Sequence, residues 1–221
     1  MALTHSTRRG VLRGGLALAG LVIGGSAAAG LVPTPRQSEG PFYPARIPLD
    51  SDTDLVQVAD RTEPAAGMVT HVFGRVLTED GRPMRGARVE IWQCDAFGRY
   101  HHPREPRGDA DPNFQGYGHM ALGADGAYRF RTIRPVPYPG RTPHIHFAVS
   151  GPGMRRLTTQ MYVAGEPGNA RDGILNAVRD PAQRAALIVP LVPAPDLDPG
   201  LEAGALAGRF DIVLGRNLLN I

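Results

Sequence analysis

The spacing of short apolar runs between turn residues constrains the fold of this chain more than any other feature. Polar and apolar residues alternate within Arg88-Val89-Glu90-Ile91-Trp92, which is typical of a strand with one buried face. With 28 glycines and 21 prolines among 221 residues, turns are too frequent for long helical bundles or coiled coils. The sequence therefore predicts an all-β fold, a β-sandwich with strands at Val69–Leu77, Ala87–Gln93, Ala127–Ile133, His144–Val149, Leu157–Val163 and Phe210–Leu214.

Two segments depart from this strand pattern. Residues 30–66 are rich in proline, aspartate and serine without a sustained period, which predicts an extended N-terminal arm before a sandwich at residues 67–221. At Asp180-Pro181 an aspartate is placed to cap, and a proline to open, a short helix that runs to Leu187. We expect one or two short helices in the whole chain.

The first 29 residues have the pattern of an export signal. Arg8-Arg9 precedes the apolar stretch Leu16–Ile23, and Ser26–Ala29 is typical of a cleavage site. This order predicts a twin-arginine signal peptide at residues 1–29 and a periplasmic or secreted protein with no stable membrane span after cleavage. The alternative is a retained anchor, although the apolar core is short against the ~20 residues of a span. Twin-arginine export carries folded proteins, often with a cofactor already inserted, and so favours a metal centre.

Charge and cysteine content exclude other classes. The chain has 24 basic and 21 acidic side chains, and Arg8, Arg9 and Arg13 lie in the leader, which leaves the remainder balanced. A balanced surface lacks the positive charge that nucleic-acid binding requires, so no nucleic-acid partner is expected. Cys94 is the single cysteine, so no intramolecular disulfide can form, and stability must come from the core or from a metal.

A pair of histidines provides the first candidate for chemistry. His144 and His146 lie two residues apart in a predicted strand, where side chains i and i+2 point to the same face. Such a pair can bind a metal or remain a solvated or hydrogen-bonded pair, and no carboxylate or cysteine has the usual ligand spacing nearby. The available hard ligands are tyrosines, whose phenols near pKa 10 ionise at neutral pH only beside a strong cation. Two phenolates with two imidazoles would favour ferric over ferrous iron.

Several stretches carry a resemblance to a known family. They are Gly74–Leu77, Gly81–Gln93, Gly98–Tyr100, Asp111–Phe114, Tyr128–Pro135, Pro143–Phe147, Thr159–Tyr162 and Arg209–Leu214. Over roughly residues 69–214 the chain resembles the intradiol ring-cleaving dioxygenases, and among them most the iron-bearing β subunits of protocatechuate 3,4-dioxygenases. The resemblance implies a transthyretin-like (prealbumin-like) β-sandwich.

The resemblance also implies a site and a reaction. It makes Tyr100, Tyr138, His144 and His146 the ligands of Fe(III), with Tyr138 the tyrosinate that substrate displaces. The implied substrates are O2 and a small aromatic diol, protocatechuate or a related catechol. Both oxygen atoms enter between the hydroxyl-bearing carbons to give a muconate-type product.

Further positions follow from the same likeness. Arg141 matches an arginine that stabilises negative charge on the substrate ring, and Gln160 matches a residue beside the ligands. Trp92 is expected in the core and Tyr43 near the pocket, while Gly140 stands where the protocatechuate enzymes carry a tryptophan. We expect a homo-oligomer or pairing with a related subunit.

Two other functions remain open at this point. The chain contains Gly-x-Val at Gly74–Val76, Gly-x-Pro at Gly81–Pro83 and Gly-Ala-x-Val at Gly86–Val89. This pattern is shared by non-catalytic transthyretin-like binding modules of the periplasm, which have no need of Tyr100 or Tyr138. A periplasmic copper protein could instead use His144, His146 and Cys94, although no axial methionine is evident.

Overall fold

The computed structural model describes residues 30–219. The predicted twin-arginine signal peptide at residues 1–29 lies outside the described residues. Within the described part, no helix combines the length and the apolar character needed to cross a membrane.

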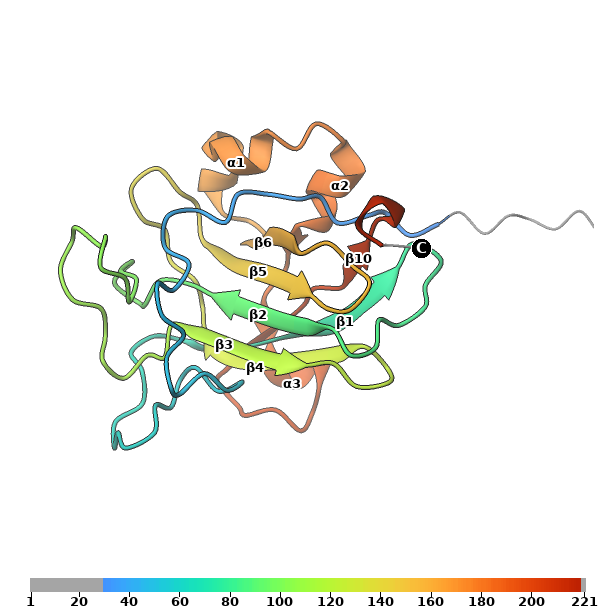
Figure 1. Cartoon of the computed structure of the whole chain (residues 1–221). Coiled ribbons are helices and arrows are strands. Elements are labelled where there is room, and N and C mark those ends of the chain that lie inside the picture. Colours follow the sequence, from blue (N-terminus) through green and yellow to red (C-terminus); the bar gives the residue numbers. More distant parts are fainter. Residues whose placement is uncertain (1–29, 220–221) are drawn as a thin grey trace, which may run out of the picture.

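The first of two five-stranded sheets is organised around β1, the longest strand (Figure 1). β1 pairs antiparallel with β4 along one edge, while β9 and β10 pair with it in parallel and β8 adds to β9. The sheet is therefore mixed rather than purely antiparallel. Its strands are β1 (Val69–Thr78), β4 (Ala127–Ile133), β8 (Val192–Pro193), β9 (Leu206–Arg209) and β10 (Ile212–Leu214).

The second sheet carries the predicted histidine pair. Its order is β3-β2-β5-β6-β7, with antiparallel neighbours except for β6 and β7, which are parallel. The register places His146 beside Trp92 on β2 and beside Gln160 on β6. The strands are β2 (Arg88–Trp92), β3 (Tyr117–Ala121), β5 (His144–Ser150), β6 (Leu157–Val163) and β7 (Ile188–Val189).

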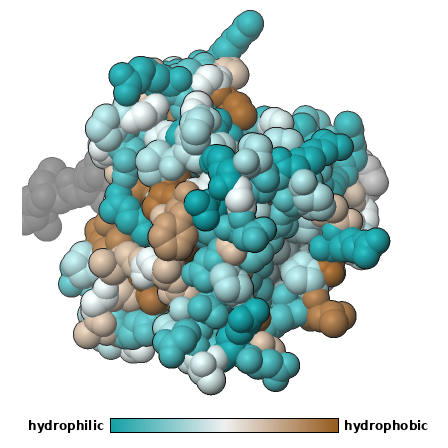
Figure 2. Space-filling view, turned by 90° about the vertical axis from the view of Figure 1, so that its left-hand side faces the viewer, coloured by the Kyte–Doolittle hydropathy of each residue, from teal (hydrophilic) through white to brown (hydrophobic). Residues whose placement is uncertain are grey.

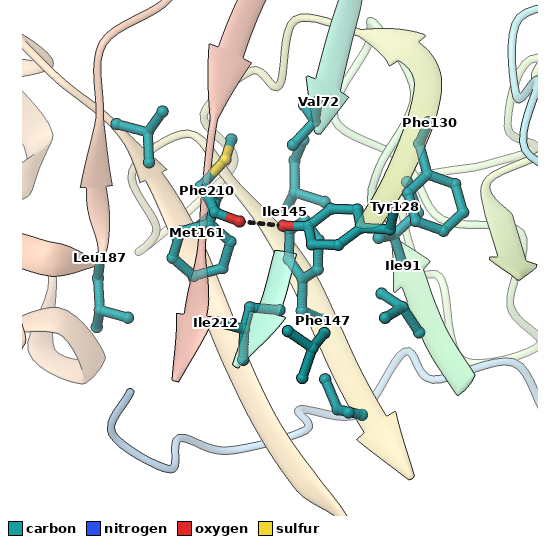
Figure 3. Close-up of a cluster of buried hydrophobic side chains, with 14 of the residues drawn as sticks. Val72, Ile91, Tyr128, Phe130, Ile145, Phe147, Met161, Leu187, Phe210 and Ile212 are labelled. Carbon is teal, nitrogen blue, oxygen red and sulfur yellow. Dashed lines mark hydrogen bonds between the residues drawn. The ribbon is translucent and has the colours of Figure 1, made fainter. Parts of the chain in front are cut away.

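One hydrophobic core joins the two sheets. Val72 and Phe130 of the first sheet lie in the same buried cluster as Ile91 and Phe147 of the second (Figure 3). Alternate side chains of the longer strands enter this cluster, as β2 and β5 show with Val89 and Ile91 and with Ile145, Phe147 and Val149. The Tyr128 hydroxyl, buried in the cluster, donates a hydrogen bond to a backbone carbonyl that precedes β10. Burial of these side chains is the main source of stability for the fold.

The short helices are α1 (Gly173–Asn176), α2 (Pro181–Ala186) and α3 (Ala194–Leu197), with 3-10 turns η1 (Pro167–Arg171) and η2 (Arg216–Leu218). Two of the short helices lie at sheet edges, α2 against β7 and α3 against β8 and β9. Asp180 caps α2 by accepting from two backbone amides, and Pro181 opens it, as the sequence predicts. The prediction of a mostly β chain is thus confirmed, whereas the short helices among the described residues number three and not the expected one or two.

The strand prediction is partly wrong near the C-terminus. The run expected at Phe210–Leu214 forms a strand only from Ile212, and a separate strand, β9, precedes it. The break lies where the Phe210 amide bonds back to Phe73 on β1 and the Asp211 side chain accepts from Arg75. The sequence also missed β3, β7 and β8.

Residues 30–66 form no helix or strand beyond one isolated bridge at Asp54. The segment is held by backbone bonds from Leu31, Thr34 and Gln37 to Glu79, Val213 and Thr158. The Gln37 side chain reaches both the Tyr162 hydroxyl of β6 and the Ile174 carbonyl of α1. This part of the chain (blue in Figure 1) therefore passes between β6 and α1 before it reaches the end of the second sheet.

Candidate metal centre and active site

Strand β5 brings His144 and His146 to one point. Both side chains lie on the same face of the second sheet and are buried, with 1% and 2% exposure. Their Nε2 atoms are 3.2 Å apart. Burial lowers the pKa of His144 to about 4. Burial and the neighbouring His144 ring lower the pKa of His146 well below its usual range. Both imidazoles are neutral at pH 7, the form that binds a metal ion.

The two tyrosines approach the histidines from different loops. Tyr100 follows a turn in which the Asp95 side chain accepts from two backbone amides and Gly98 adopts a positive φ of 76°. Tyr138 begins a second turn, closed by the Arg141 amide on the Tyr138 carbonyl, with Gly140 at φ 80°. Each loop thus delivers one phenol to the beginning of β5.

The rings of these four residues converge. The Tyr138 hydroxyl lies 3.5 Å from Nε2 of His144, and the two tyrosine rings meet edge to face with centroids 5.8 Å apart. The Tyr100 ring is 6.3 Å from that of His146. The structure therefore brings together all four predicted ligands, two phenol oxygens and two imidazole nitrogens.

The two tyrosines differ in their surroundings. Tyr100 is 3% exposed, whereas Tyr138 is only partly buried and borders a hollow. Burial, with a contribution from neighbouring Tyr138, raises the pKa of Tyr100 well above 10. Burial also raises the pKa of Tyr138, but the Arg141 guanidinium opposes that rise. Tyr138 is therefore the more accessible of the two phenols.

The donor set fits an iron ion. The Tyr100 hydroxyl is buried and has no hydrogen-bond partner among the described residues, which costs about 1–3 kcal/mol unless another group binds that oxygen. A cation placed among the four donors would bind it. A mixed set of phenolate and imidazole suits a hard, trivalent metal better than a soft one.

The copper interpretation is wrong for the described residues. No group of three or more His, Cys, Asp or Glu side chains there could hold a metal ion. Cys94 is 1% exposed and its thiol faces the Val136 carbonyl instead of the histidines. Its place in a small buried cluster with Trp92 and Tyr100 agrees with the expectation of a small hydrophobic residue.

Arg141 and Gln160 lie together in a buried network. The Arg141 guanidinium donates to Oε1 of Gln160 at 2.5 Å and to Oδ2 of Asp172 at 2.8 Å. Gln160 also accepts from the Tyr162 hydroxyl at 3.0 Å and donates to the Ser38 carbonyl at 2.9 Å. Burial and these partners hold both side chains in fixed positions beside the phenols.

Sequence reasoning missed Asp172. Its side chain is fully buried, caps α1 through the amides of Ile174 and Leu175, and also accepts from the Thr142 amide. The hydrogen bonds from Leu175 and Arg141 outweigh burial and lower the pKa of Asp172. The sequence Asp172–Leu175 has the pattern of a helix cap, and that signal could have identified the residue, although not its arginine partner.

Glu90 on β2 was also missed. Its buried carboxylate accepts from the hydroxyls of Tyr43 at 3.0 Å and Tyr117 at 2.6 Å, and pairs with Arg156 at 3.3 Å. Tyr43 touches the edge of Trp92, and Trp92, as expected, is buried. His101 and His102 lie outside the donor group.

A hollow of about 420 Å³ adjoins Tyr138, one of the four candidate ligands. Its lining includes Gly140 and Arg141 from the same loop, and Pro167, Arg171 and Asp172 from the segment around η1. Figure 2 shows this end of the molecule, where β5 begins, as a largely hydrophilic face on which apolar side chains gather in one area. The hollow is large enough for a single aromatic ring and its substituents.

Two tyrosines and two histidines that converge on a β-scaffold indicate a particular class of protein. Comparison with known proteins identifies that class. A family model described as Dioxygenase matches residues 38–215. The chain belongs to the intradiol ring-cleaving dioxygenase family.

Individual relatives are similar over most of the chain. The protocatechuate 3,4-dioxygenase beta chain of Burkholderia cepacia is 40% identical over 189 residues, covering 81% of this chain and 78% of the relative. Catechol 1,2-dioxygenase 2 of Acinetobacter lwoffii is 34% identical, covering 69% of this chain and 62% of the relative. A solved dioxygenase domain from a carbohydrate-binding fusion protein of Streptomyces sp. SirexAA-E is 33% identical, with a TM-score of 0.61, and covers 83% of this chain and 99% of that domain.

Proposed function

We propose that this chain is a non-haem Fe(III) dioxygenase with a transthyretin-like β-sandwich. It inserts both atoms of O2 between the hydroxyl-bearing carbons of a catechol-type aromatic, protocatechuate or a related diol, and forms a muconate-type diacid. The observation that carries the proposal is the convergence of Tyr100, Tyr138, His144 and His146 on one point. Family membership supports iron as the metal.

The four donors would hold the ion, and the two phenolates would favour its ferric state. When bound, ferric iron supplies a Lewis acid that draws electron density from a catecholate and prepares it for O2. The chain's own residues then have three tasks, which are to bind the diol, accept one of its protons and stabilise charge on its ring.

The difference between the tyrosines supports a division of roles. Tyr100 is 3% exposed and suits a ligand that remains in place, whereas Tyr138 is only partly buried and suits one that leaves. On leaving, the Tyr138 oxygen can take up a proton from an incoming diol hydroxyl. The Arg141 guanidinium lies close enough to Tyr138 to act on its pKa and would stabilise negative charge on the diol ring. Gln160 holds that guanidinium in place.

The ring substituent of the substrate is open to a direct test. Relatives include proteins named for protocatechuate, catechol and hydroxyquinol. The hollow beside Tyr138 has Gly140 at its rim, and a Cβ there would meet no atom within 4 Å. The absence of a side chain at this point leaves room for a ring that carries a substituent.

Oxygen uptake by iron-loaded protein with catechol, protocatechuate and hydroxyquinol, followed by identification of the products, tests the proposal. We expect uptake with at least one diol and a product opened between the hydroxyls. We also expect a visible tyrosinate-to-iron absorption band that Tyr100→Phe shifts or abolishes. Ring opening beside the hydroxyls, or colourless protein with stoichiometric iron, would contradict the assignment. A protein that binds a diol without consuming oxygen would instead be a non-catalytic module.

We further propose export by the twin-arginine pathway and assembly as a homo-oligomer or with a related subunit. The Arg8-Arg9 pair before an apolar stretch supports the first proposal. Mass spectrometry of the mature N-terminus and light scattering of the purified protein test these points separately.

A further inference from the structure

The two candidate histidine ligands are held in different ways. Nδ1 of His144 donates to the Thr142 carbonyl at 2.7 Å, so its ring orientation is fixed and its Nε2 lone pair faces the other donors. Nδ1 of His146 is buried and has no hydrogen-bond partner among the described residues. Metal-binding histidines usually donate their second ring nitrogen to a partner. Something other than a hydrogen bond at Nδ1 must therefore help to set the angle of the His146 ring.

Packing supplies that restraint. The Trp92 ring lies parallel to the His146 ring, with centroids 4.8 Å apart and planes 8° from parallel. Gly40 lies near the same ring, because a Cβ built on it would be 3.5 Å from Cε1 of His146. Gly40 also has a φ of 74°, a conformation that a residue with a side chain adopts only with strain. The His146 ring thus stacks on an indole and has a backbone segment near its Cε1 atom.

That segment, residues 38–43, is here called the strap. It is tied to the second sheet at both ends, by the bond from Gln160 to the Ser38 carbonyl and by the bond from Tyr43 to Glu90. Between these ties, Phe42 stacks on the Tyr100 ring with centroids 4.7 Å apart and planes 17° from parallel. The strap therefore stacks on one phenol of the candidate centre and lies near one of its imidazoles.

We propose that the strap and Trp92 position His146 and Tyr100. A segment far from the candidate ligands in sequence would then fix the orientation of two of them. Glu90 is the positioning residue that anchors the strap through Tyr43. This proposal rests on the proposed function for the identity of the ion, which is iron. The orientation of the His146 ring, however, is a property of the metal-free chain as well.

The test uses the full chain with two strap variants, Gly40→Ala and Phe42→Ala. The control is Tyr128→Phe, which removes a buried hydroxyl bond in the core between the sheets and leaves the strap intact. Iron affinity is measured by competition with a chelator, together with the tyrosinate-to-iron band. We expect each strap variant to lose about 10–100-fold in iron affinity and to shift the band. The control should remain within about 2-fold of wild type, since distant sites act independently.

A second measurement separates this proposal from the dioxygenase assignment. Side-chain ¹⁵N spectra of the metal-free protein report whether the His146 ring has one fixed environment. We expect a single sharp ring signal in wild type and in Tyr128→Phe, and a broadened or shifted one in both strap variants. If wild-type protein binds no iron, the assignment fails and these spectra still decide the role of the strap. Unchanged spectra in the strap variants, or an equal loss of iron affinity in the control, would overturn the proposal.

Discussion

Replacement of Asp172 by alanine tests how much the contacts of Asp172, including its pair with Arg141, contribute to the free energy of unfolding. The Asp172 carboxylate accepts four hydrogen bonds, from Arg141 at 2.8 Å, from the Thr142 amide at 3.1 Å and from two α1 amides at 3.0 Å each. Its side chain is 0% exposed and that of Arg141 is 14% exposed. Loss of one partner of such a buried pair costs about 3–5 kcal/mol, and loss of a helix cap adds about 1 kcal/mol.

Asp180→Ala provides the matched control. Asp180 caps α2 through two backbone amides in the same manner, but it is exposed and no arginine contacts its side chain among the described residues. We expect about 1 kcal/mol from this variant and about 4 kcal/mol or more from Asp172→Ala, measured by urea unfolding. In a chain of this size these losses correspond to roughly 2–4 °C and roughly 8–24 °C in Tm.

The contribution of Asp172 to the stability of the fold should decrease at low pH. Because the pKa of Asp172 is lowered in the folded protein, its contribution is fully present above the unfolded pKa of about 4 and is lost as the pH falls through the folded value. The gap between wild type and Asp172→Ala should therefore narrow below about pH 4. Equal losses from Asp172→Ala and Asp180→Ala at pH 7 would show that the arginine pair adds nothing and would refute the reasoning.

Three further outcomes follow from burial, close contact and metal binding. Burial raises the pKa of Cys94 to about 12, so the thiol should resist a disulfide reagent at pH 8 and react only after unfolding in urea. Gly74→Ala would place a Cβ 2.1 Å from the Phe210 carbonyl oxygen and should cost about 3 kcal/mol in urea unfolding, whereas Gly173→Ala, with no atom within 4 Å, should leave stability nearly unchanged. Removal of iron by a chelator should lower Tm, by an amount equivalent to about 4 kcal/mol if free iron stands at about 1,000 times its Kd, and an unchanged melting curve would argue against binding at the buried donors.

The limits of prediction from sequence are clear at β3. The run Tyr117–Ala121 has no alternation of polar and apolar residues, so its periodicity gives no strand signal. Gly118 is present because the arm lies against this strand, and a Cβ there would be 2.4 Å from the Asp52 carbonyl oxygen. The requirement comes from a segment more than sixty residues away in sequence, and no local pattern can express it. β8 is two residues long and includes Pro193, which also hides it from local rules.

The four candidate ligands and the residues that hold neighbouring groups in place differ in how readily the sequence identifies them. His144 and His146 are identifiable because strand geometry relates residues two apart, and the two tyrosines because a family motif fixes their order. Asp172 and Glu90 act through contacts formed only after folding, with Arg141 and with Tyr43. Their residue types are common on protein surfaces, and burial alone distinguishes them.

This difference reflects how the site is built. The sheet supplies the histidines on a rigid strand, where the hydrogen bonds of β2 and β6 on either side fix the backbone of β5. The tyrosines come from loops, and one of those loops has Gly140 beside the hollow. A centre with all four donors on the sheet would have no donor free to leave, and one with all four on loops would lack a fixed point for the ion. Under the proposed function, two rigid nitrogens and two loop-borne oxygens, one buried and one more accessible, would let an ion stay bound while one ligand position opened to a diol.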